Sequence, residues 1–237
     1  MKQKLQIVTP VYNEEKNIEY TIVSFFDDLS DKGIELEFII SEDGSSDNSV
    51  SVIKALSEEY KVTLYSSKER KNYTESVLFG LSKATTDIVA FVDSDGQYDP
   101  SDLMKMYKRL EKGTFVLGFR NPRVDSYFRR FISKSFRLVY KFILKLNLVD
   151  PSSGYFIGYK EDLQKVLQSF QSGYLKEGFW WEFYARAHYQ NIKIIEEPVK
   201  HFDRKYGNSV VFKFTKLPKI AITNLLGLLR LRRDIFN

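Results

Sequence analysis

Short apolar segments alternate with segments of helical periodicity along the first half of the chain. Apolar runs at 4–11, 36–42, 62–67, 87–95 and 114–120 have the length of buried strands. Between them, apolar residues recur at helical spacing over 13–33, 49–60, 73–84 and 100–113, with Gly33 as one helix stop signal. This alternation predicts an α/β fold with a Rossmann-like, mostly parallel central sheet and helices on both faces.

The second half of the chain is more helical and more basic. The pattern predicts a long helix over 126–147, a strand and helix start within 148–163, a helix over 179–190 and a strand over 192–199. One or two amphipathic helices follow a polar loop and are interrupted near Pro218. We therefore expect one large domain over 1–212 and a C-terminal amphipathic helical segment over 213–237.

Charge is unevenly distributed along the chain. The net charge is +5, yet residues 120–145 hold eight Lys or Arg against one Asp, and residues 200–237 hold nine against two Asp. The rest of the chain is therefore net acidic. Two basic, aromatic-rich segments on an acidic body indicate an anionic partner: phosphates, an anionic membrane surface or nucleic acid. An ordinary solvated face is the alternative.

Two acidic turns follow predicted strands, at 41–47 and at 93–99. Ligands of parallel sheets bind beyond the carboxyl ends of the strands, so we expect these turns to be neighbours in space. In an extended segment, Asp93 and Asp95 point the same way. Their hard oxygens suit Mg²⁺ or Mn²⁺, and Gln97 can add a carbonyl oxygen or orient a water. Taken alone, this D-x-D is weak evidence for a metal site, because the same pattern occurs often in surface turns.

Several classes of function lack their sequence signals. There is no G-x-G-x-x-G and no G-x-x-x-x-G-K-[ST], so the usual dinucleotide and P-loop phosphate sites are not expected. The chain has no cysteine, which excludes disulfides and thiolate chemistry and fits a cytoplasmic setting. We find no secretion signal before the first turn and no apolar run of about 18 residues, so no simple transmembrane helix is expected.

Three motifs occur in a characteristic order: TPVYNEE at 9–15, SEDGSSDNS at 41–49 and FVDSDGQYDP at 91–100. They resemble the P-x-Y-N-E start, the D-D-G/N-S-x-D turn and the D-x-D metal site of family 2 glycosyltransferases, which have the GT-A fold. Further segments look like the polyprenyl-phosphate branch of that family, which includes dolichol-phosphate mannosyltransferases and undecaprenyl-phosphate glycosyltransferases. These segments are GFR at 118–120, RRFIS at 129–133, DPSSGYF at 150–156, WWEFYARA at 180–187, IIEEPV at 194–199 and R-x-x-G-x-S at 204–209.

The resemblance implies an inverting, metal-dependent glycosyltransferase, a hexosyltransferase that moves a sugar from a UDP- or GDP-sugar to a polyprenyl phosphate. Mg²⁺ or Mn²⁺ would be the cofactor, held by Asp93, Asp95 and Gln97. Asp93 would also contact the nucleotide, and Asp95 would have a catalytic role. The metal would stabilise the charge that builds on the departing diphosphate.

The same resemblance implies a nucleotide pocket lined by Pro10, Tyr12 and Glu14. Tyr12 would stack on the base and Glu14 would accept hydrogen bonds from ribose hydroxyls, with ordinary turn chemistry as the alternative for Pro10 and Tyr12. Glu42 and Asp43 stand where the family usually has two aspartates. The preferred base, uracil or guanine, is therefore left open.

On the acceptor side, Arg120, Arg129, Ser133 and Arg204 match positions that the family uses near the acceptor phosphate, and Arg120 would also be catalytic. The planar guanidinium of arginine suits a phosphate and can hold its oxygen in line with the reacting carbon. The alternative is a basic amphipathic helix on the surface of the protein or of a membrane.

A phosphate acceptor is already ionised at neutral pH, whereas a sugar hydroxyl needs a protein base. Glu182 is the best remaining carboxylate for a catalytic base, with Glu177 second; a helix charge or a salt-bridge partner is the alternative for Glu182. The second hypothesis is therefore transfer to a glycan hydroxyl in capsule, lipopolysaccharide or other surface polysaccharide assembly. The third is a GT-A-like binding module without catalysis.

The C-terminal segment mixes apolar and basic positions between 213 and 233, which suits a helix in a membrane interface. We expect peripheral contact with the cytoplasmic face of the membrane, where a lipid-phosphate acceptor would lie. The alternative is packing on the same domain or on a second copy, as a homodimer. Nucleic acid is not expected as a partner, because no nucleic-acid motif is present and the acidic turns would repel a phosphate backbone.

Overall fold

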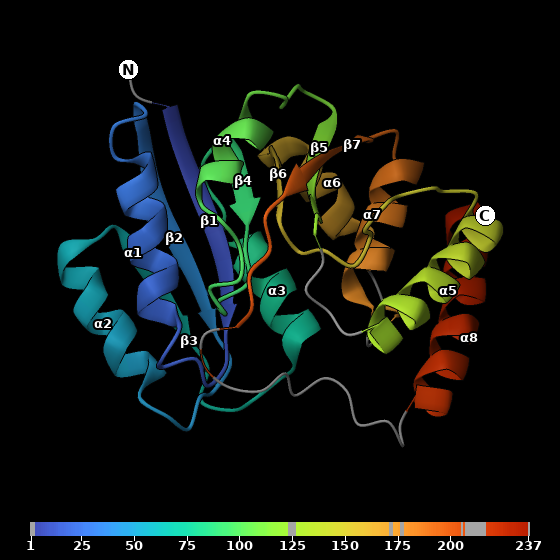
Figure 1. Cartoon of the computed structure of the whole chain (residues 1–237), viewed down its shortest axis with the longest axis horizontal. Coiled ribbons are helices and arrows are strands. Elements are labelled where there is room, and N and C mark those ends of the chain that lie inside the picture. Colours follow the sequence, from blue (N-terminus) through green and yellow to red (C-terminus); the bar gives the residue numbers. More distant parts are fainter. Residues whose placement is uncertain are drawn as a thin grey trace.

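A computed structural model describes residues 3–122, 127–170, 173–175, 178–204, 206 and 217–236, without the side chains at 128, 129, 131 and 217–219. Within these residues, a seven-stranded sheet lies at the centre with helices on both faces (Figure 1). The strands are β1 (Gln3–Val11), β2 (Ile34–Glu42), β3 (Val62–Ser66), β4 (Ile88–Phe91), β5 (Thr114–Arg120), β6 (Phe156–Tyr159) and β7 (Lys193–Val199). The helices are α1 (Ile18–Leu29), α2 (Ser49–Glu59), α3 (Tyr73–Ser82), α4 (Ser101–Tyr107), α5 (Tyr127–Leu144), α6 (Lys160–Gln168), α7 (Phe179–Tyr189) and α8 (Leu217–Phe236).

The strand order is β3-β2-β1-β4-β6-β5-β7. β1 pairs in parallel with β2 and β4, β2 with β3, and β5 with β7, whereas β6 runs antiparallel to both of its neighbours. The predicted mostly parallel sheet is thus confirmed. All of these strands except β6 end at one edge, where the loop that leads into β6 also arrives. This edge gathers the turns that the sequence singled out.

Both faces of the sheet are buried, which explains why its strands are apolar throughout rather than alternating. In β1, Ile7 packs into a core shared with α1, α2 and α4, while Val8 packs into a core shared with α3, α6 and α7. Both side chains are fully buried. The sequence pattern and the observed two-layer core therefore agree.

α8 is packed into the second of these cores. It lies beside α5 at one end of the molecule and also contacts α7 (Figure 1). Leu228 and Leu231 of α8 are fully buried. Pro218 lies in the first turn of α8, and residues 207–216 before it lie outside the described residues, so the expected interruption near Pro218 stays a prediction. Proline is tolerated there because a first-turn residue has no intrahelical partner for an N–H.

None of the described helices is both long enough and apolar enough to cross a membrane.

Candidate active site

The loops after β1 and β2 are joined by hydrogen bonds. The Asn13 N–H donates to Ser45 Oγ at 3.0 Å, and Asn13 Oδ1 accepts from the Ser46 N–H at 2.8 Å. The Glu14 N–H donates to Ser49 Oγ at 2.9 Å. Asn13 has a φ of 55°, a left-handed conformation that asparagine tolerates well. The first two motifs of the sequence thus form one rigid rim of the site.

The third motif begins where β4 ends. Asp93 and Asp95 are both half-buried, and Ser94 between them is buried. The Ser94 carbonyl accepts from Thr21 Oγ1 at 3.0 Å, which ties this segment to α1. Residues 94 and 95 lie in a turn, which Gly96 continues with a φ of 70°, so the expectation of an extended segment over 93–95 is wrong. The two carboxylates nevertheless lie close enough for the charge of Asp95 to act on Asp93.

These two carboxylates repel each other in a poorly solvated place. Burial, followed by the charge of Asp95, raises the pKa of Asp93 to about 7. Burial also raises the pKa of Asp95, against the opposing charges of Arg204 and Arg120. A divalent cation would relieve this repulsion, and carboxylate oxygens are the ligands that Mg²⁺ and Mn²⁺ prefer. The pair therefore fits a metal.

The pair does not complete a coordination shell. Over the described part of the chain, no group of three or more His, Cys, Asp or Glu residues could hold a metal ion. Mg²⁺ characteristically binds through one or two carboxylates together with waters and substrate phosphates. A metal at Asp93 and Asp95 would accordingly depend on a phosphate-bearing ligand.

On the nucleotide side, Pro10 is buried at the end of β1 and Tyr12 is half-buried beyond it. The Arg70 guanidinium lies 3.9 Å from the centre of the Tyr12 ring. Arg70 thus covers one face of the ring that the sequence assigns to base stacking. A base that uses this face must displace Arg70 or enter between the two side chains.

Glu42 and Asp43 are both buried at the end of β2. Glu42 Oε2 accepts from Ser66 Oγ at 2.6 Å, and Glu42 Oε1 accepts from the Ser45 N–H. Asp43 Oδ1 accepts from the Lys71 N–H at 2.8 Å, and burial raises the pKa of Asp43. Both acidic residues line a cavity of about 270 Å³ between β2, β3 and α3. A bond from Glu42 to a base would compete with the bonds that tie β2 to β3.

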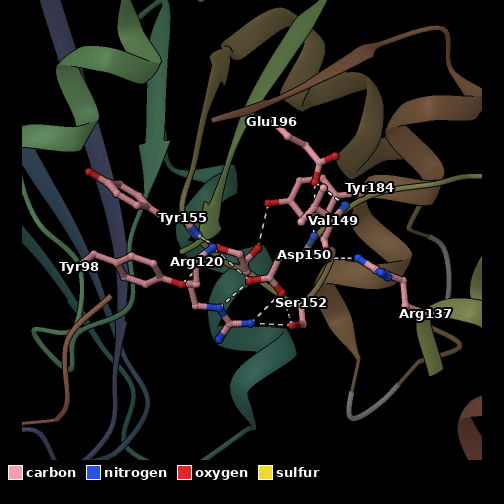
Figure 2. A network of polar contacts seen from close by, with 10 residues as sticks. Tyr98, Arg120, Arg137, Val149, Asp150, Ser152, Tyr155, Tyr184 and Glu196 are labelled. Carbon is pink, nitrogen blue, oxygen red and sulfur yellow. Dashed lines mark hydrogen bonds and ion pairs between the residues drawn. The ribbon is translucent and has the colours of Figure 1, made fainter. Parts of the chain in front are cut away.

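Arg120 ends β5 and is held by the loop before β6 (Figure 2). Its Nε donates to Asp150 Oδ2 at 2.7 Å, and its Nη2 donates to Asp150 Oδ1 at 2.8 Å and to Ser152 Oγ at 2.7 Å. Asp150 is buried, and its N–H and that of Val149 donate to Glu196 of β7. Two hydrogen bonds to the fixed Asp150 carboxylate therefore orient the Arg120 guanidinium. The positive charge of Arg120 is close enough to oppose the rise that burial causes in the pKa of both Asp93 and Asp95.

The segment after β7 crosses the same edge. Gln97 Nε2 donates to the Phe202 carbonyl at 2.8 Å, and the Phe202 N–H donates to the Gln97 carbonyl at 2.8 Å. The Arg204 guanidinium pairs with the Glu14 carboxylate, whose pKa is raised by burial. The structure thus brings Arg204, Glu14, Gln97 and Asp95 together. The Gln97 amide nitrogen is used by the backbone, so its side-chain oxygen is the atom that can serve a metal.

Glu182 does not have the surroundings of a catalytic base. It is 1% exposed in the first turn of α7, pairs with Arg186 at 2.8 Å and accepts from the N–H groups of Tyr174 and Leu175. Arg186 also pairs with Asp234 of α8. The alternative role as a salt-bridge partner is what the structure supports, because this carboxylate is saturated by interactions within the core.

The remaining acceptor positions are less completely described. Ser133 is half-buried on α5. The side chain of Arg129, all of Glu177 and the end of the R-x-x-G-x-S motif at Ser209 lie outside the described residues.

The sequence did not predict three contacts of the site. These are the ion pair of Arg120 with Asp150, the packing of the Arg70 guanidinium on the Tyr12 ring, and the hydrogen bond of Tyr73 with Asp93. The Tyr73 hydroxyl donates to Asp93 Oδ1 at 2.8 Å. One signal was present in the sequence. The loop between β3 and α3 follows a parallel strand, so its residues had to reach the same edge as the acidic turns.

The fold is similar to that of solved glycosyltransferases. The crystal structure of glucosyl-3-phosphoglycerate synthase from Mycobacterium tuberculosis in complex with Mn²⁺, UDP and phosphoglyceric acid matches with a TM-score of 0.70 and 18% identity, over 97% of this chain and 78% of that chain. The complex of that enzyme with Mg²⁺ and UDP matches with a TM-score of 0.65 and 17% identity, over 95% and 79% of the two chains. A structure described as a mycobacterial protein matches with a TM-score of 0.64 and 20% identity, over 95% and 75%.

At these identities the likeness shows a shared fold, the GT-A fold of glycosyltransferases. Residues 6–167 match the family described as glycosyl transferase family 2, which defines the class of this protein as a glycosyltransferase. The chain belongs to this family.

Proposed function

We propose that the protein is an inverting, divalent-metal-dependent glycosyltransferase that moves a sugar from a UDP- or GDP-sugar to a polyprenyl phosphate. The observation that carries the proposal is the convergence of opposite charges at one sheet edge, where Asp93 and Asp95 lie within electrostatic reach of Arg120 and, for Asp95, of Arg204. The carboxylates suit a metal bound to the donor diphosphate, and the arginines suit an anionic acceptor.

The chemistry follows from these groups. A divalent metal, when bound, supplies positive charge to the departing diphosphate. Asp93 and Asp95 would hold that ion. Arg120, oriented by Asp150, would direct a phosphate oxygen of the acceptor towards the anomeric carbon. That oxygen is already ionised, so no protein base is required, in keeping with the core role of Glu182.

Solved proteins with the same fold support the proposed nucleotide-sugar donor and the proposed divalent metal. The solved structures of glucosyl-3-phosphoglycerate synthase include complexes of UDP with Mn²⁺ or Mg²⁺, and one of them also contains phosphoglyceric acid. By analogy, this protein would use a UDP-sugar as donor, a divalent metal as cofactor and a phosphate-bearing molecule as acceptor.

A lipid acceptor is supported by the outer surface of α5 and α8. Both helices expose apolar side chains; Phe142 of α5 is 83% exposed and Ile222 of α8 is 61% exposed. The α5–α8 surface comprises Leu138, Lys141 and Phe142 of α5, Lys145 directly after α5, and Ile222, Leu225, Leu226 and Leu229 of α8. Apolar groups interspersed with lysines suit an anionic bilayer. We propose peripheral docking at the cytoplasmic face, with the segment 213–237 as part of the contact.

The donor site is tested by calorimetric titration with UDP and then GDP, each with Mn²⁺. We expect metal-dependent binding of one nucleotide to the wild type and its loss in Asp95→Ala. Absence of binding of both nucleotides to the wild type contradicts the proposal.

The acceptor is tested with a radiolabelled donor sugar. We expect label in a polyprenyl phosphate presented in detergent, and none in soluble glycans or in phosphoglyceric acid. Transfer only to a glycan would support the hydroxyl-acceptor hypothesis instead, and transfer only to phosphoglyceric acid would assign a soluble phosphorylated acceptor.

A further inference from the structure

A chain of two hydrogen bonds runs from α7 through α3 to the end of β4. The indole Nε1 of Trp180 donates to the Tyr73 hydroxyl at 2.9 Å, and that hydroxyl donates to Asp93 Oδ1 at 2.8 Å. Tyr73 is the first residue of α3, directly after Asn72, whose side chain accepts from the Glu75 N–H at 3.0 Å. The helix cap therefore fixes the backbone from which the phenol reaches Asp93.

The direction of this chain is fixed at both ends. An indole N–H can only donate, so the Tyr73 oxygen must act as its acceptor. An ionised carboxylate can only accept, so Tyr73 donates its single hydroxyl hydrogen to Asp93. Without Trp180, the Tyr73 oxygen would lose the donor that helps to hold it in place. Trp180 thus positions the Tyr73 hydroxyl while its hydrogen is donated to the carboxylate.

The indole has little freedom to move. Trp180 is 5% exposed, and its ring meets the Phe91 ring edge-on with 4.5 Å between centroids. A Cβ atom built on Gly154 would approach Trp180 Nε1 to 2.9 Å, so the backbone before β6 is packed against the indole. Phe91 lies in β4, two residues before Asp93. One rigid core therefore carries both ends of the hydrogen-bond chain.

Tyr73 itself is 44% exposed, so burial of its ring is not what this arrangement achieves. What it does achieve is to engage one oxygen of Asp93 and to hold the plane of the carboxylate. A metal ligand works best when a second residue fixes its orientation.

We infer that Tyr73, directed by Trp180, is a positioning residue that orients the Asp93 carboxylate for the metal-bound diphosphate of the donor. This inference rests on the proposed function, because it concerns the same carboxylate. It assigns no direct contact with the substrate to either Tyr73 or Trp180.

The test is a double-mutant cycle on nucleotide affinity, measured by calorimetry with the full chain. The variants are Tyr73→Phe, Trp180→Phe and the combination of both, with UDP or GDP as the wild type requires. Loss of a hydrogen bond to a charged group is expected to weaken binding with Mn²⁺ about tenfold in Tyr73→Phe. Affinity for the nucleotide without metal should stay at the wild-type value. Trp180→Phe should weaken metal-dependent binding in the wild type but not in the Tyr73→Phe background.

Tyr159→Phe is the matched control, since Tyr159 is a half-buried tyrosine at the end of β6, on the opposite edge of the sheet. It should bind as the wild type does. Wild-type metal-dependent affinity in Tyr73→Phe overturns the inference. An equal loss with and without Mn²⁺, together with a lower melting temperature, also overturns it, because that outcome marks a purely structural contact. If the wild type itself binds no nucleotide, the proposed function fails first, and this inference fails with it.

Discussion

Among single residues, Asp93 shows how the surroundings of a side chain set its chemistry. Its carboxylate is half-buried, faces the charge of Asp95 and accepts a hydrogen bond from Tyr73. Burial is the largest cause that raises its pKa to about 7, from a usual value of 3.8. The native protein therefore retains a proton on Asp93 at pH values where the unfolded chain has released it. This proton uptake stabilises the metal-free fold at low pH, and the stabilisation is lost as the pH rises towards 7.

Asp93→Asn removes this titration, so the metal-free variant should gain stability over the wild type as the pH rises. We expect its melting temperature to exceed that of the wild type by about 2–4 °C at pH 8, with a smaller difference at pH 5. Thermal unfolding followed by circular dichroism at both pH values measures this. Asp31→Asn, at an exposed position, is the control, and it should change the melting temperature by the same small amount at both pH values. An equal offset for Asp93→Asn at both pH values would contradict the prediction.

Among the elements, α8 shows how a terminal helix becomes part of the catalytic fold. Glu182 of α7 accepts from the N–H groups of Tyr174 and Leu175 and so fixes that stretch of backbone. Gly227 of α8 packs directly on it; a Cβ atom built there would lie 2.5 Å from the Tyr174 carbonyl oxygen. Only a residue without a side chain allows this approach. The packing of α8 therefore depends on the buried ion pair of α7.

Gly227→Ala should destabilise the protein by about 1–2 kcal/mol, because overpacking against backbone outweighs the better helix propensity of alanine. Urea unfolding monitored by tryptophan fluorescence gives the free energy of unfolding. Gly173→Ala is the matched control, since a Cβ atom added there meets nothing within 4 Å. Equal stability of the two variants would show that α8 is not held against residue 174.

Over the whole molecule, the α5–α8 surface and the loops proposed to bind the donor belong to different elements of the structure. α5 and α8 lie at one end of the long axis, and α1 and α2 lie at the other (Figure 1). The described part of α5 contains no acidic residue, whereas the turns after β2 and β4 are acidic. If the protein docks on a membrane as proposed, this separation would let the membrane attract one end of the molecule while the acidic turns stay available to a metal.

Binding to anionic vesicles should therefore depend on charge at the α5–α8 surface. Reversing one charge with Lys141→Glu is expected to reduce binding to phosphatidylserine vesicles about tenfold, and salt should weaken what remains. Co-sedimentation measures the bound fraction, with phosphatidylcholine vesicles as the reference. Lys54→Glu on α2, at the far end of the long axis, is the matched control. Equal loss for both variants would indicate a response to net charge rather than to this surface.

The order of the elements and the class of fold followed from the sequence because they depend on local patterns. The run from 114 to 120 was expected as a strand and is β5, and the periodicity at Ile18, Ile22 and Phe25 was expected as a helix and is α1. Hydrophobic periodicity reports which residues must leave water, and that requirement is local. The acidic turns could be placed at one edge for a similar reason, since parallel strands all end there.

The pairing of side chains was decided by the tertiary structure. The i,i+4 spacing of Glu182 and Arg186 on a predicted helix allows an ion pair, but nothing in the sequence shows that the N–H groups at 174–175 also bind this carboxylate. The contacts of Arg120 with Asp150 and of Trp180 with Tyr73 join residues that are 30 and 107 positions apart. Hydrogen-bond partners depend on how helices and loops pack after the strands have been ordered. The sequence alone determined the kinds of groups at the site and the edge at which they gather, whereas three-dimensional packing decided which groups are already engaged and which remain available to a ligand.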